Sequence, residues 1–153
     1  TEVVRVVWNN NEIDISDLLK LFWECHDPTQ GNRQGNDSGS QYRSAIYTTN
    51  KDHLSKAIDS KNSYQKELQN NGFGEITTEI DNNIKFYFAE DYHQQYLSKP
   101  GSRPYCSAMP TKVELKNFKG SNFKLNEKIW SHYNWDINHC ILRGENTPIK
   151  SNL

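Results

Sequence analysis

The spacing of hydrophobic residues along the chain predicts two helices. Leucine and aromatic residues recur at helical intervals from Leu18 to His26, and Ser16 just before them fits the N-cap position. Pro28 ends this helix, because proline disfavours helical geometry in the residue before it. A longer helical stripe covers Lys51–Asn70 and stops at the Asn-Asn-Gly sequence around its end.

Other segments are rich in β-branched and aromatic residues, which is typical of strands. They are Glu2–Trp8, Tyr42–Thr49, Glu75–Ile80 and Ile84–Asp91. Only an Asp-Asn-Asn turn separates the last two, so they are predicted to form a hairpin. Helices and strands mix without strict βαβ alternation. The pattern therefore favours an α+β fold: a two-layer domain with helices on a mixed, mostly antiparallel sheet.

Composition and charge narrow the class of protein. The chain has 153 residues, enough for one domain with a hydrophobic core. A mean hydropathy of −0.93 is polar, but four Trp, eight Tyr and six Phe argue against disorder. The net charge of −1 comes from mixed charges without a basic patch, and no apolar run reaches the length of a membrane helix. We therefore expect neither a nucleic-acid nor a membrane partner.

The cysteines do not form a metal or disulfide motif. Cys25, Cys106 and Cys140 are far apart and odd in number, which indicates a reducing compartment, and we expect a cytoplasmic protein. Potential oxygen and nitrogen ligands match no closed motif either, so no metal and no cofactor are predicted; these are His26, Asp27, Asp37, Glu90, Asp91 and His93. The GNRQGND sequence lacks the lysine of a phosphate-binding P-loop.

One stretch, HDPTQGNRQGNDSGSQYRSAIY, combines glycines with charged and aromatic residues. Asp37 and Tyr42 lie on it, and Glu2 lies on an apolar face of the first predicted strand. A carboxyl in apolar surroundings has a raised pKa and can act as a general acid, and a tyrosine hydroxyl can donate to a developing oxyanion. The structural alternative is that Asp37 makes an Asx-turn, Tyr42 packs and Glu2 lies at a solvated sheet edge.

The same stretch resembles the signature segment of the peptide methionine sulfoxide reductase A family. EVVRVVW, ITTEI and FYFAEDYHQQYLSK add to the resemblance, which covers Thr1 to about Cys106. It implies a mixed-sheet α+β fold of the ferredoxin-like plait type. It also implies an oxidoreductase for protein repair under oxidative stress, which returns methionine (S)-sulfoxide, in proteins or free, to methionine by thiol chemistry.

The resemblance also assigns roles to individual residues. It makes Glu2 the proton donor to the sulfoxide oxygen, and Asp37 and Tyr42 the groups that support that oxygen and bind substrate. Cys106 falls where the family often has a recycling cysteine, although Pro104 replaces the usual glycine before Tyr-Cys. Asp27 and Arg33 are expected to brace the loop.

The family's nucleophilic cysteine lies in a Gly-Cys-Phe-Trp motif that this sequence does not contain. Because the chain begins at Thr1 inside a strand-like segment, we interpret it as a fragment and expect the chain alone to be inactive. Residues 1–108 would form the reductase-like domain, and residues 109–153 an extension of unknown role. Thioredoxin is the expected reductant and a monomer the expected state. The alternative is a non-catalytic relative that binds oxidised methionine or a protein partner.

Overall fold

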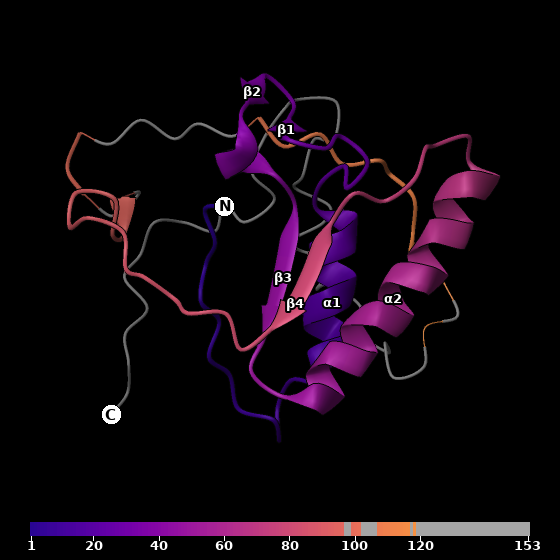
Figure 1. Ribbon diagram of the computed structural model, residues 1–153, viewed down its shortest axis with the longest axis horizontal. Helices are drawn as coiled ribbons and strands as arrows, with labels where there is room; N and C mark the ends of the chain where they lie inside the picture. The colour runs from indigo at the N-terminus through magenta and orange to yellow at the C-terminus, as the bar shows by residue number, and fades with distance from the viewer. Residues whose placement is uncertain (97–98, 102–106, 117, 119–153) are drawn as a thin grey trace.

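The computed structural model describes residues 1–96, 99–101, 107–116 and 118. Its elements, in chain order, are α1 (Ile15–Glu24), β1 (Arg33–Gln34), β2 (Asp37–Ser38), the 3-10 turn η1 (Ser40–Tyr42), β3 (Ala45–Thr48), α2 (Lys51–Asn70) and β4 (Glu79–Asn82). Helix α2 packs on both β3 and β4, and α1 packs on α2 (Figure 1). This is the α+β architecture that the hydrophobic pattern predicts.

Both helices begin after an N-cap residue whose side chain accepts a hydrogen bond from an unpaired amide of the first turn. In α1 the cap is Asp14 rather than Ser16: its carboxylate accepts from Ser16 N at 2.8 Å, while Asp17 Oδ2 accepts from Asp14 N at 3.0 Å. In α2 the side chain of Asn50 accepts from His53 N at 2.8 Å, and the helix has the predicted bounds. The predicted cap of α1, Ser16, thus lies two residues after the cap in the structure, Asp14.

The strands differ from the prediction in two ways. Strand β4 does not form a hairpin with the segment after it; it pairs in parallel with β3, in a register that joins Ala45 to Glu79 and Thr48 to Asn82. The predicted strands Glu2–Trp8 and Ile84–Asp91 are not strands among the described residues. Helix α2 connects the two parallel strands, so β3, α2 and β4 form a βαβ unit that the alternation argument missed.

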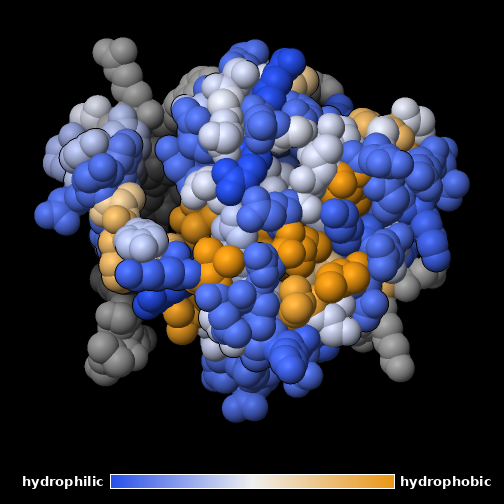
Figure 2. Space-filling model, viewed as in Figure 1, coloured by the Kyte–Doolittle hydropathy of each residue, from blue (hydrophilic) through white to orange (hydrophobic). Residues whose placement is uncertain are grey.

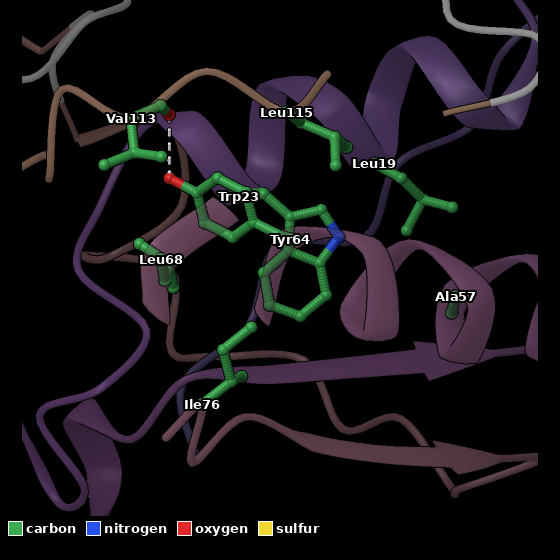
Figure 3. Close-up of a cluster of buried hydrophobic side chains, with 8 residues drawn as sticks. All are labelled: Leu19, Trp23, Ala57, Tyr64, Leu68, Ile76, Val113 and Leu115. Atoms are coloured by element: carbon green, nitrogen blue, oxygen red, sulfur yellow. Dashed lines mark hydrogen bonds between the residues drawn. The ribbon is translucent and has the colours of Figure 1, made fainter. Parts of the chain in front are cut away.

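The core lies between the two helices and the chain that returns over them (Figure 3). Its buried hydrophobic residues are Leu19, Trp23, Ala57, Tyr64, Leu68, Ile76, Val113 and Leu115. The hydroxyl of Tyr64 donates to Val113 O at 3.0 Å, which ties this late segment to α2. The packed core thus includes residues after position 108. The role of residues 109–153 as an extension stays a prediction, and most of them lie outside the described part of the chain.

Hydrophobic side chains also gather in the middle of the face that Figure 2 shows, surrounded by hydrophilic ones. The N-terminal segment and the segment after β4 contribute many of the exposed large side chains, among them Val4 (87% exposed), Val7 (83%) and Phe88 (74%). The two segments meet where the guanidinium of Arg5 lies 5.4 Å from the ring centre of Phe86.

In the described residues no helix has the length and apolar character to cross a membrane.

Candidate functional site

The three residues predicted to carry chemistry line one open pocket of about 260 Å³. Glu2 comes from the N-terminal segment, Asp37 from β2 and Tyr42 from η1. The other lining residues are Gln34, Gln41, Arg43, Ser107 and Ala108. Residues separated by up to 106 positions in the sequence, from Glu2 to Ala108, therefore line one pocket.

Asp37 is half-buried and is held at the base of the Gly-rich loop. It pairs with Gln34 across the two-residue strands β1 and β2. The hydroxyl of Ser107 donates to Asp37 Oδ2, and it also lies 2.9 Å from Gln34 O. The Ser107 hydroxyl thus links the carboxylate of Asp37 to the backbone of Gln34.

The loop is braced from within by Asp27, as the sequence suggests. Its Oδ1 accepts from Thr29 N at 2.9 Å, and its Oδ2 accepts from Gln30 Nε2 at 3.1 Å. Gln30 Oε1 in turn accepts from Gly35 N at 2.8 Å. Arg33 contributes through its Nε, which donates to Gly35 O at 2.6 Å. Asp27 and Arg33 thus shape the loop, while the pocket itself is lined by other residues.

Gly35 allows the closest backbone approach at the site. Its φ of +56° is in the left-handed region, and a Cβ placed there would lie 2.0 Å from Ser107 O. Both conditions require glycine, because any other residue would be strained and would collide with backbone. This contact brings Ser107 and Ala108 to the pocket, opposite the loop.

Backbone contacts of the first two residues place Glu2 at the pocket. Glu2 N donates to Gln41 O at 2.9 Å, and Thr1 Oγ1 lies 2.9 Å from Arg43 O. The apolar strand face expected around Glu2 is not present: the residue is exposed and belongs to no strand. Its position beside Asp37 and Tyr42 therefore follows from the contact with Gln41 rather than from strand alternation.

Tyr42 lines the pocket from η1, and the residue is 36% exposed. The next residue, Arg43, donates from Nε to Glu79 Oε2 at 2.8 Å and from Nη1 to Ser40 O at 2.8 Å. The hydrogen bond from Arg43, with a second from Tyr47, lowers the pKa of Glu79. The carboxylate therefore stays charged at neutral pH, and the ion pair is present beside the pocket.

His26 and Cys25 lie away from the pocket. His26 is buried, with Nδ1 2.8 Å from Phe22 O and Nε2 2.8 Å from Ser44 Oγ, so it is a hydrogen-bonded interior histidine. The thiol of Cys25 lies 3.2 Å from Phe22 O at the end of α1. Within the described ranges, no three His, Cys, Asp or Glu side chains are grouped to hold a metal ion.

Burial of His26 makes stability depend on pH. Desolvation lowers its pKa from 6.5 to about 4, against smaller raising effects of Phe22 O and Asp27. A lowered pKa means that the unfolded chain takes up the proton first, so stability is present above pH 6.5 and lost as pH falls towards 4. We expect the free energy of unfolding to drop by about 2 kcal/mol between pH 7.5 and 5.

Urea unfolding at several pH values measures this drop. His26→Gln should flatten the slope between pH 7.5 and 5, whereas the same change at the exposed His93 should leave it as in the wild type. Equal slopes in all three proteins would show that His26 does not set the pH dependence.

Some residues of the site were not predicted, and one predicted residue cannot be placed. Ser107 and Ala108 carry no motif, so only the fold shows that they line the pocket. Arg43 was part of the quoted QYRSA sequence and was given no role. Cys106, the predicted recycling cysteine, lies outside the described residues, and the catalytic roles of Glu2, Asp37 and Tyr42 stay predictions.

Comparison with known proteins gives a consistent family. A family model described as peptide methionine sulfoxide reductase matches residues 1–127. The mitochondrial peptide methionine sulfoxide reductase of Bos taurus is 63% identical over 112 residues, which cover 73% of this chain and 48% of the relative. A peptide methionine sulfoxide reductase of Pseudomonas putida (strain GB-1) is 54% identical over 115 residues, 75% of this chain and 51% of the relative. The chain thus spans about half the length of these relatives.

A solved structure agrees with this similarity. Methionine sulfoxide reductase A of Corynebacterium diphtheriae aligns with a TM-score of 0.57 and 42% sequence identity, over 66% of this chain and 51% of that one. The similarity in sequence is therefore accompanied by similarity in fold.

The names of the relatives also correct one prediction and decide the family. The predicted cytoplasmic location is wrong on this comparison, because the similar proteins of Bos taurus, Homo sapiens, Rattus norvegicus and Mus musculus are named mitochondrial. A missing zinc or disulfide motif indicates reduced thiols without distinguishing between reducing compartments. The family itself is the one that the Gly-rich loop indicates. By its matched sequence and its fold, the chain belongs to the peptide methionine sulfoxide reductase family.

Proposed function

We propose that this chain supplies the oxygen-binding and proton-donating part of a peptide methionine (S)-sulfoxide reductase site. The observation that carries the proposal is that Glu2, Asp37 and Tyr42 line one pocket. A sulfoxide oxygen bears a partial negative charge, and it becomes more basic as sulfur is attacked. Hydrogen-bond donors and an acid at that oxygen therefore stabilise the transition state more than the bound substrate.

In the proposed reaction, a thiolate attacks the sulfoxide sulfur and Glu2 donates a proton to the oxygen. Tyr42 donates a hydrogen bond to the same oxygen, and Asp37 holds the donors around it. The attack forms a bond between the two sulfur atoms, and the sulfur–oxygen bond breaks as the protonated oxygen leaves as hydroxide. Hydroxide then attacks the enzyme sulfur and breaks the sulfur–sulfur bond, which releases methionine as the thioether and leaves the thiol oxidised to a sulfenic acid. A second thiol condenses with the sulfenic acid to a disulfide and releases water, and an external dithiol reduces that disulfide.

The family resemblance supplies the remaining assignments. We propose Cys106 for the recycling thiol, thioredoxin for the external dithiol, and a monomer as the working state. Substrates would be methionine sulfoxide in oxidised proteins and the free amino acid. The attacking thiol of the family belongs to the Gly-Cys-Phe-Trp motif, which is not among these 153 residues. Cys25 is a poor substitute, because it is at the end of α1 and does not line the pocket.

The test joins this chain to a segment from a family member that carries the Gly-Cys-Phe-Trp motif. In that chimera, Glu2→Gln is expected to slow single-turnover reduction of a methionine sulfoxide peptide by about 100-fold or more, because the proton donor is lost. The single-turnover rate is measured as loss of the sulfoxide peptide. Turnover is measured as the same loss with dithiothreitol present to reduce the disulfide.

Two controls accompany this experiment. Glu75→Gln, an exposed glutamate that does not line the pocket, should keep the full rate. The 153-residue chain alone should show no turnover. A Glu2→Gln chimera as fast as its parent would take the proton-donating role away from Glu2, and turnover by the chain alone would show that one of its own thiols attacks sulfur.

A further inference from the structure

Arg43 fastens the turn that carries Tyr42 to the sheet. Its Nη1 donates to Ser40 O at 2.8 Å, and Ser40 is the first residue of η1. Its Nε donates to Glu79 Oε2 at 2.8 Å, and Glu79 is the first residue of β4. One planar guanidinium thus joins η1 to β4 through two hydrogen bonds of fixed direction.

Tyr47 completes this contact from β3. Its hydroxyl donates to Glu79 Oε1 at 2.9 Å and lies 3.4 Å from Arg43 Nη2. Both carboxylate oxygens of Glu79 are therefore engaged. We call Arg43, Glu79 and Tyr47 the clamp. Arg43 precedes β3 by two residues, Tyr47 is the third residue of β3, and Glu79 is the first residue of β4.

The turn η1 is held by hydrogen bonds rather than by burial. None of its residues is buried, and Gly39 before it provides no side-chain cap. Its backbone bonds are Tyr42 N to Gly39 O at 3.1 Å, the longer Arg43 N to Ser40 O at 3.4 Å and, from the N-terminal segment, Glu2 N to Gln41 O at 2.9 Å. Since burial does not fix the turn, the polar contacts of Arg43 and of the N-terminal segment restrain the backbone that carries Tyr42.

Stability alone does not account for the clamp. The side chains of Arg43 and Glu79 are 30% and 42% exposed, and an ion pair of such exposure stabilises a fold only slightly. The Arg43 side chain nevertheless restrains two elements relative to each other, because it donates to η1 at Ser40 and to β4 at Glu79. Its consequence is expected in the geometry of the pocket, which Arg43 and Tyr42 both line.

We propose that Arg43, held by Glu79 and Tyr47, is the positioning residue that directs the Tyr42 hydroxyl towards the bound sulfoxide oxygen. The role given to that hydroxyl rests on the proposed function. The restraint of η1 itself depends only on the contacts of the clamp. When the clamp is lost, η1 is no longer restrained at Ser40, and the ring of Tyr42 can move out of the pocket.

The first experiment observes the Tyr42 ring without any ligand. The full chain is labelled with 3-fluorotyrosine, and Tyr42→Phe identifies the Tyr42 signal by fluorine NMR. We expect Arg43→Gln and Glu79→Gln to move and broaden that signal, while Glu75→Gln leaves it unchanged. Arg43→Lys, which keeps the charge but not the fork of donors, should restore it only in part. An unchanged Tyr42 signal in both clamp variants would overturn the proposal.

A pH titration tests the same restraint in the wild-type chain. The charged or titratable groups that face Glu79 are the Arg43 guanidinium, the Tyr47 phenol and, more weakly, the Thr1 amino group. The hydrogen bond from Arg43 lowers the pKa of Glu79, so the clamp stays intact until pH falls below the ordinary range of a glutamate. The wild-type Tyr42 signal should shift there, and Glu79→Gln should abolish the shift. A shift that persists in Glu79→Gln would contradict control by the clamp.

The second experiment measures binding of N-acetyl-L-methionine-(S)-sulfoxide methylamide by NMR titration. Loss of a well-directed hydrogen bond should raise Kd in the clamp variants by about 2- to 10-fold, with Glu75→Gln at the wild-type value. Unchanged Kd values in the clamp variants would overturn the positioning of the hydroxyl towards the oxygen. If the wild-type chain does not bind the sulfoxide at all, the proposed function fails, while the fluorine signal still decides whether the clamp restrains Tyr42.

Discussion

Gly35→Ala is expected to separate the Gly-rich loop from the segment that contains Ser107, and so to destroy the pocket. An alanine at a left-handed φ costs about 1–2 kcal/mol of strain. Here the new Cβ would also lie 2.0 Å from Ser107 O, which is backbone and cannot rotate away. Relieving such an overlap by backbone movement typically costs about 1–3 kcal/mol more. The movement breaks the hydrogen bond from Ser107 to Asp37.

Gly31→Ala is the matched control for this prediction. Gly31 has a similar φ of +66°, but a Cβ there would meet nothing within 4 Å. It should therefore show the strain alone, and its Ser107 amide signal should keep the wild-type chemical shift. Urea unfolding gives the two losses of stability, and the NMR chemical shift of the Ser107 amide reports the contact. Equal losses in the two variants, with the Ser107 signal unchanged in both, would show that the close approach does not hold the pocket together.

Trp23→Ala is expected to cost about 3–5 kcal/mol of stability, enough to unfold much of a marginal domain. Trp23 is fully buried between α1 and α2, and its ring lies 5.8 Å from that of Tyr64 (Figure 3). Its Nε1 donates to Ser60 Oγ at 2.8 Å, so the change leaves both a cavity and a buried hydroxyl with one partner fewer.

Ile58→Ala on α2 removes another large apolar side chain and controls for helix composition. Ile58 is 44% exposed, so its truncation should cost less than about 1 kcal/mol. Thermal or urea unfolding of both variants tests the difference. Similar losses would place the stabilising contacts elsewhere than in the cluster around Trp23.

The helices could be predicted from the sequence because their periodicity is local. Helix α2 has the predicted bounds, since Asn50 caps its start and polar residues with Gly72 follow its end. The first helix was predicted at the right place, but its cap was assigned to Ser16. Two acids in a reciprocal arrangement, Asp14 and Asp17, provide the cap instead.

The strands were harder to predict, because pairing depends on contacts that are distant in sequence. Glu75–Ile80 and Ile84–Asp91 are rich in strand-forming residues and close together, which suggests a hairpin. In the structure, β4 pairs with β3 instead. Helix α2 connects these two strands and returns the chain to the same end of the sheet, so that β4 lies parallel to β3. In the same way, Tyr42 belongs to a 3-10 turn rather than to β3, because Gly39 begins a tight turn just before the strand.

At the site, the residue types could be predicted and their surroundings could not. Asp37 and Tyr42 were selected for their chemistry on a Gly-rich loop, and they line the pocket. Glu2 lines it too, although the apolar strand face that motivated the choice is absent. Ser107 reaches the pocket, and Glu79 and Tyr47 hold Arg43, only through tertiary contacts, for which no single sequence carries a signal.

The most direct test of the sulfoxide pocket is an amide NMR titration of the full chain with N-acetyl-L-methionine-(S)-sulfoxide methylamide. The corresponding thioether and the R epimer serve as controls, because they lack the oxygen or place it differently. We predict that the S sulfoxide shifts the amides of Glu2, Asp37, Tyr42 and Ser107, and that the controls shift them much less. Equal shifts with the thioether, or no shift at these four amides, would contradict the account.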